Sequence, residues 1–179
     1  MKRTVWTFGL ISGGIIAALM VIALPFQDQV GESGYVIGYS TMILAFLMVY
    51  FGIRSYRDNV MAGTIGFGRA FKVGILITLI ASTCYVATWE VIYHTMAPDF
   101  AEKYAARAIE RAQAAGATEA ELAVQKEKMA KFAEMYKNPL VNVGMTYLEV
   151  FPVGVVVVLV SAGVLSRKKS GATLEVARA

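Results

Sequence analysis

Four long stretches with almost no charge limit what this chain can fold into more than any other feature of its sequence. Residues 4–27 and 33–53 contain no Asp, Glu, Lys or Arg, and residues 73–96 and 140–166 contain one acid each. Each stretch is long enough to cross about 30 Å of hydrocarbon, which takes roughly 18–20 apolar residues. Because a bilayer core offers the backbone no hydrogen-bond partner, each stretch is expected to be helical. We therefore predict four transmembrane helices, at about residues 4–27, 34–53, 71–96 and 139–166.

The composition agrees with a membrane protein. Hydrophobic residues make up 57% of the 179 residues and charged residues 17%, against roughly 45–50% and about 25% in soluble domains. This balance excludes a disordered chain and argues against a water-soluble monomer. The single cysteine, Cys84, excludes an intramolecular disulfide and a cysteine-based metal site, and we expect no metal or other cofactor. The first apolar stretch is longer than the roughly 7–15 residues of a signal peptide, so we expect it to be retained.

The distribution of basic residues predicts the orientation, because cytoplasmic segments of membrane proteins are enriched in Lys and Arg. The amino end, the segment between the second and third stretches and the tail hold ten of the 17 basic residues, whereas residues 27–32 hold two acids and no base. Both termini are therefore expected in the cytoplasm. The basic residues then serve as topology anchors, so nucleic acid is not expected as a partner. The ten are Lys2, Arg3, Arg54, Arg57, Arg69, Lys72, Arg167, Lys168, Lys169 and Arg178.

Residues 97–138, on the outer side, form the only sizeable polar segment, with seven basic and seven acidic residues. The segment is rich in alanine and favours helix. The turn at Ala115-Gly116-Ala117 divides it, and Thr118 with Glu121 three residues later is typical of a capping box. We predict an extracytoplasmic αα-hairpin inserted between the third and fourth transmembrane helices of a single membrane domain over residues 1–179.

Each predicted hairpin helix has one apolar stripe. We expect the two stripes to pack on each other, and they are also the candidate surface for a protein partner. The first is formed by Phe100, Tyr104 and Ala108, and the second by Leu122, Met129, Phe132 and Tyr136.

Several short segments at matching spacings resemble a known family. They are residues 51–58 (FGIRSYRD), Gly63, Ile65, Phe67-Gly68, Ala70-Phe71-Lys72, Gly74, Tyr136-Lys137-Asn138-Pro139, Glu149, Phe151-Pro152 and Gly154. On these residues, nearly the whole chain resembles the bacterial membrane-protein family catalogued as domain of unknown function 4199. The resemblance implies a small four-span envelope protein and supplies no catalytic residue. With the topology predicted above, we expect the protein in the bacterial inner membrane.

Two acids inside the apolar stretches are the first candidates for chemistry, because an ionised carboxylate in hydrocarbon is costly. Glu90 lies 18 residues after Lys72, and Glu149 lies 18 residues before Arg167. If both basic residues mark one interface, the two acids are level, about 27 Å above it, and two level carboxylates favour sharing a proton. The alternative is two interfacial acids that bond to neighbouring groups.

Two further residues belong to this candidate proton or cation site. His94, one turn after Glu90, offers that acid a local partner. Pro152, three residues after Glu149, frees a backbone carbonyl, as a kink-forming proline does in any membrane helix.

A second candidate site is the basic segment between the second and third stretches. Arg54, Arg57, Arg69 and Lys72 are candidates for contact with lipid headgroups. The glycine-rich residues 63–68 lack the lysine spacing and the preceding strand of a nucleotide-binding loop, so we interpret them as an interfacial turn.

Small and aromatic residues complete the prediction. Gly9, Gly13 and Ala17 recur at four-residue spacing and allow close helix approach, either within a four-helix bundle or between two copies in a homo-oligomer. Trp89 and Tyr93, together with Tyr35 and Tyr147, are expected in the outer aromatic belt.

The sequence contains no recognisable enzyme site. His94 is the only histidine, and the two intramembrane acids are glutamates with no accompanying nucleophile. The leading hypothesis is a non-enzymatic membrane protein whose hairpin serves protein interaction or envelope organisation. The alternative is a small proton- or cation-coupled carrier or channel subunit that uses Glu90 and Glu149.

Overall fold

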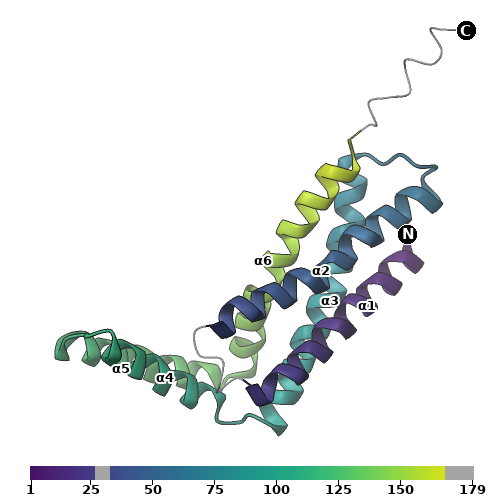
Figure 1. The fold of residues 1–179 in the computed structure, drawn as a ribbon. Helices are drawn as coiled ribbons and strands as arrows, with labels where there is room; N and C mark the ends of the chain where they lie inside the picture. Colours follow the sequence, from purple (N-terminus) through teal and green to yellow (C-terminus); the bar gives the residue numbers. More distant parts are fainter. Residues whose placement is uncertain (27–32, 168–179) are drawn as a thin grey trace, which may run out of the picture. The chain divides into compact units, whose positions relative to one another are not determined.

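The computed structural model describes residues 1–26 and 33–167 (Figure 1). Within these residues the fold has six α-helices and no strand. Four of the helices, α1, α2, α3 and α6, are long and apolar enough to cross a membrane, which confirms a long apolar helix at each of the four predicted spans. The helices are α1 (Lys2–Ala23, followed by the 3-10 turn η1, Leu24–Phe26), α2 (Ser33–Val60), α3 (Phe67–Thr95), α4 (Phe100–Ala114), α5 (Glu119–Tyr136) and α6 (Pro139–Leu165).

The chain divides into two compact units, and both α3 and α6 contribute to each of them. The first unit comprises Met1–Tyr85 and the described residues from Val150 onward, and the second comprises Val86–Glu149. The acidic segment at residues 27–32 and the basic residues Lys168, Lys169 and Arg178 lie outside the described part of the chain.

The connection between α2 and α3 is shorter than predicted. Helix α2 continues beyond residue 53 to Val60, and α3 begins at Phe67 rather than at residue 71. The reversal is made at Ala62 and Gly63, whose φ angles are 53° and 85°; glycine adopts such angles without strain. The four basic residues assigned to this connection lie on helices, because helical backbone hydrogen bonds continue beyond the apolar stretches. Arg54 and Arg57 are on α2, and Arg69 and Lys72 are on α3.

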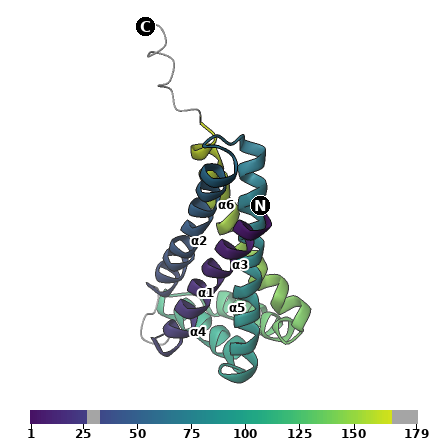
Figure 2. The ribbon, with the colours of Figure 1, turned by 90° about the vertical axis from the view of Figure 1, so that its right-hand side faces the viewer.

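Glycines set the close packing of the first unit, a bundle of α1, α2, the first part of α3 and the second part of α6 (Figures 1 and 2). Gly9 lies against Ile80 and Gly13 against Cys84, where an added Cβ would approach within 2.8 and 2.6 Å. The expected close approach at Gly9 and Gly13 is therefore made between α1 and α3 of the same chain.

The same packing fixes the direction and register of the first unit. Gly74 lies against Val158 of α6, and Gly154 lies against Thr78 of α3. As the residue number rises on one helix it falls on the other, so α3 and α6 are antiparallel. The Ser12 hydroxyl, which is fully buried, donates a hydrogen bond to the Ala45 carbonyl at 2.8 Å and ties α1 to α2.

The second unit contains the predicted αα-hairpin, formed by α4 and α5. Helix α4 ends before Gly116, whose φ of 81° reverses the chain, and the Ala117 N–H closes the turn on the Ala112 carbonyl at 3.0 Å. Helix α5 begins with the predicted capping box, in which Thr118 and Glu121 each bond to the backbone of the other. Local sequence signals therefore define both ends of the turn.

Candidate functional site

A buried polar cluster joins three helices of the second unit. The indole N–H of Trp89, on α3, donates to the Tyr136 hydroxyl of α5 at 2.8 Å and to Oδ1 of Asn142 on α6 at 3.2 Å. The Thr146 hydroxyl, one turn further along α6, donates to the Asn142 carbonyl at 2.9 Å and to its Oδ1 at 3.3 Å. These four residues, the polar cluster, are all buried.

Aromatic rings extend the polar cluster into the hairpin. Phe100 contacts the Trp89 ring edge-on at a centroid distance of 4.7 Å. Tyr104 of α4 and Phe132 of α5 lie 5.3 Å apart, and Phe132 lies 5.3 Å from Tyr136. The two apolar stripes therefore pack on each other, as the sequence predicts, and Leu122 and Met129 are half-buried on the same helix.

The sequence interpretation missed two members of the polar cluster and misplaced a third. Asn142 and Thr146 were not identified, although two polar residues at four-residue spacing in an apolar span are a recognisable signal. The sequence predicts Trp89 in the outer aromatic belt, but its side chain is 7% exposed, because its N–H finds partners on α5 and α6. The side chain of Tyr35, also assigned to that belt, lies outside the described part.

The polar cluster is suited to holding helices together. Burial raises the pKa of Tyr136 to about 12, and its contacts with Trp89 and Thr146 oppose the rise. The phenol is therefore neutral at physiological pH, as are the indole, amide and hydroxyl groups beside it. A neutral, hydrogen-bonded set of side chains fixes geometry without a cost for burying charge. The Nδ2 atom of Asn142 is buried without a protein hydrogen-bond partner, so both of its N–H donors are left for further bonds.

The structure does not bring the two intramembrane acids to one level. Trp89 meets Asn142, Glu90 is the next residue on α3, and Glu149 lies seven residues after Asn142 on antiparallel α6. The acids are therefore about eight residues apart along the helix axes, or about 12 Å at 1.5 Å per residue. The expectation of a level pair is wrong, and with it the expectation that Glu90 and Glu149 share one proton.

The environments of these acids also differ. Glu90 is half-buried, and its Oε1 is buried without a hydrogen-bond partner. Nδ1 of His94 lies 2.8 Å from the Glu90 carbonyl oxygen and 3.8 Å from Oε2 of its carboxylate, so His94 is the local partner predicted for Glu90. Glu149 is exposed on α6. Pro152 lies inside α6, so the Leu148 carbonyl lacks its helical donor.

The basic residues assigned to lipid headgroups have different neighbours in the first unit. The Nε atoms of Arg57 and Arg54 lie 2.7 and 3.6 Å from carboxylate oxygens of Asp58. Arg69 donates to the Met61 sulfur at 3.3 Å, and Lys72 is exposed near the start of α3. The described residues contain no group of three or more His, Cys, Asp or Glu side chains that could hold a metal ion.

A family model described as "Protein of unknown function (DUF4199)" matches residues 7–167, nearly the whole chain. No curated protein and no solved structure gives a significant match.

Proposed function

Because the chain belongs to DUF4199, a family of proteins of unknown function, we propose its function from the geometry of the second unit. The protein is a non-enzymatic membrane protein that presents the α4–α5 hairpin as a rigid docking element for a protein partner. The observation that carries this proposal is the polar cluster, which joins the hairpin at Tyr136 to α3 and α6 through Trp89 and Asn142. A hairpin held at its base keeps its outer surface in a constant position, which lowers the entropy lost on binding.

The surface of the hairpin supports its exposure to water. Asp99 pairs with Lys103 at 2.9 Å and Glu127 with Lys131 at 2.7 Å, in exposed positions one turn apart. Such pairs are tolerated in water and costly in hydrocarbon. Since the apolar stripes pack on each other, a partner would meet the outer faces of the helices, where Val124 is 64% exposed.

The distribution of charge supports an orientation with both termini in the cytoplasm of a bacterium and the hairpin outside the inner membrane. The described residues of the first unit contain seven basic side chains and one acid, Asp58. The hairpin is neutral overall. Lys and Arg are enriched on the cytoplasmic side of bacterial membrane proteins, so we assign the end of the first unit that carries these seven basic side chains to the cytoplasm.

The orientation can be tested with single cysteines in a Cys84→Ala background. A membrane-impermeant thiol reagent should label Lys126→Cys, on the hairpin, in intact cells. It should label Thr64→Cys, between α2 and α3, only after the cells are opened. The reverse pattern would overturn the orientation.

The docking function is tested by photo-crosslinking in cells. A photoreactive amino acid replaces Lys126 or Lys128, both exposed on α5, and replaces Thr64 in a control. A single adduct with one other protein is expected from the hairpin positions and not from Thr64. Phe132→Ala, which removes the ring that packs on Tyr104 and Tyr136, should abolish the adduct. The proposal is overturned if the hairpin positions crosslink only to a second copy or to nothing.

The carrier alternative has less support. It requires Glu90 and Glu149 to act as a pair. The contact between Trp89 and Asn142 instead sets α3 and α6 in a register in which the two acids lie at different levels. The remaining polar site near Glu90 is local, with His94 on the same helix.

A further inference from the structure

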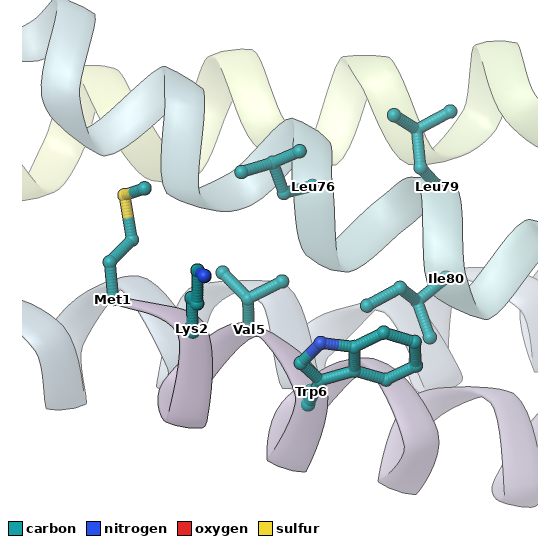
Figure 3. A pocket seen from close by; sticks show the side chains of 7 residues that line it. All are labelled: Met1, Lys2, Val5, Trp6, Leu76, Leu79 and Ile80. Atoms are coloured by element: carbon teal, nitrogen blue, oxygen red, sulfur yellow. The ribbon is translucent and has the colours of Figure 1, made fainter.

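A groove lies between the start of α1 and the first half of α3, within the first unit (Figure 3). Its volume is about 300 Å³, and six of its seven lining residues are apolar. Lys2 is the one charged residue of the lining. The residues used below are Lys2, Val5 and Trp6 on α1 and Leu76, Leu79 and Ile80 on α3.

The groove opens toward the surroundings of the bundle. Trp6 is 58% exposed and Leu79 is 41% exposed, and both belong to helices that are apolar enough to cross a membrane. The hydrocarbon of the bilayer is therefore the medium that reaches the groove, and an acyl chain matches its apolar walls.

Positive charge lies at one end of this groove. Lys2 is in its lining, and Lys72 precedes Leu76 by four residues, so it lies on the same face of α3 one turn toward the helix start. Both lysines are exposed, and the lining contains no carboxylate. Two ammonium groups beside an apolar groove complement a ligand with an anionic head and a hydrocarbon tail.

We propose that this groove binds one anionic phospholipid, with an acyl chain against Val5, Trp6 and Leu79 and the headgroup phosphate between Lys2 and Lys72. The site goes beyond the docking function of the hairpin and does not depend on it. It requires only that the end of the first unit with Lys2 and Lys72 lies at a membrane surface, on either side.

A second groove of the first unit shows why the first is favoured. It is lined by Arg54 and Asp58 together with Phe8 and Phe51. There the Asp58 carboxylate lies 3.6 Å from Nε of Arg54 and 2.7 Å from Nε of Arg57, so it offsets one of the two positive charges, whereas the lining of the first groove contains no carboxylate. Arg54 is therefore a suitable control position.

The test uses the fluorescence of Trp6, which lines the groove. The full-length protein is placed in vesicles of phosphatidylcholine and phosphatidylglycerol in which one or the other lipid carries brominated acyl chains that quench indole on contact. The chain has two tryptophans, so the signal of Trp89 is measured in Trp6→Phe and subtracted. The ratio of quenching by the two brominated lipids gives their relative affinity at the groove.

Phosphatidylglycerol is expected to be preferred, by about fivefold for each lysine, because a basic residue near an anionic surface contributes about 1 kcal/mol. The preference should fall toward one in Lys2→Gln/Lys72→Gln and persist in Arg54→Gln. A ratio of one in the unsubstituted protein would overturn the proposal, because the groove then takes any membrane lipid. An equal loss in Arg54→Gln would also overturn it, because the effect would then come from general surface charge.

Discussion

The packing at Gly154 on α6 can be tested with a single methyl group. A Cβ added at Gly154 would lie 2.4 Å from Cγ2 of Thr78 and 3.0 Å from two ring carbons of Phe46. Thr78 and Phe46 are both 0% exposed, so neither side chain can turn into open space. Carbon atoms in contact are normally roughly 3.5–4.0 Å apart. Gly154→Ala therefore forces Thr78 to retreat by about 1 Å or the helices to separate.

The magnitude follows from two opposing effects. Overpacking of a core costs about 1–3 kcal/mol, whereas alanine gains up to about 1 kcal/mol over glycine in a helix. With the full gain subtracted, the net loss in free energy of unfolding for Gly154→Ala is up to about 2 kcal/mol. Gly163, also on α6, is the matched control, since an added Cβ there meets no atom within 4 Å. Gly163→Ala is expected to be neutral or stabilising by up to about 1 kcal/mol.

The assay is unfolding of the full-length chain in mild detergent by added dodecyl sulfate, followed by far-ultraviolet circular dichroism. Thr78→Ser removes Cγ2, the atom nearest the added methyl, so Gly154→Ala should be less harmful in that background, with a coupling of about 1 kcal/mol. Equal unfolding free energies for Gly154→Ala and Gly163→Ala, together with no coupling to Thr78, would refute the packing argument.

Two predictions concern the second unit. Thr118→Ala should destabilise α5 by about 1 kcal/mol, measured as lost helicity, because the Thr118 hydroxyl caps the Glu121 N–H. Hydrogen bonds from Thr118 lower the pKa of the Glu121 carboxyl. The stabilising effect of Glu121 is therefore present above its unfolded-state pKa and is lost as pH falls through its folded-state pKa. In a pH series, Thr118→Ala should weaken this loss of stability in acid. Tyr136, with a pKa raised to about 12, should give a tyrosinate absorbance step near that pH that Tyr136→Phe removes. Its contribution to stability should be lost between about pH 10 and 12, and an ordinary titration near pH 10 would contradict its burial.

Features that depend on neighbouring residues were predictable from the sequence. The four spans follow from uncharged stretches, because hydrocarbon admits a single chain only with its backbone bonds satisfied internally. The hairpin follows from Gly116, from the pairing of Thr118 with Glu121 and from the apolar stripes, which all act within a few residues of each other. The packing of Tyr104 on Phe132 needed only the assumption that two short amphipathic helices bury their apolar faces together.

The relative depth of Glu90 and Glu149 along their helices was not predictable from neighbouring residues. Two acids counted from Lys72 and Arg167 are level only if these two basic residues lie in one plane. In the first unit, however, Gly74 lies against Val158, so Lys72 is level with about residue 160 of α6. Arg167 lies seven residues beyond that point, about 10 Å further along the axis. The two basic residues therefore do not mark one plane.

The amino-acid sequence by itself determined the helices, their number and the hairpin, because hydrophobicity and capping act along the chain. The tertiary structure alone decided how far each helix slides along its neighbour, since that depends on which small residue receives which side chain, as Gly74 receives Val158. In the second unit, tertiary packing brings Trp89 to Tyr136 and Asn142 and makes a buried polar cluster from residues separated by 47 and 53 positions. Hydropathy carries no information on this register, because every turn of an apolar helix is equally soluble in lipid.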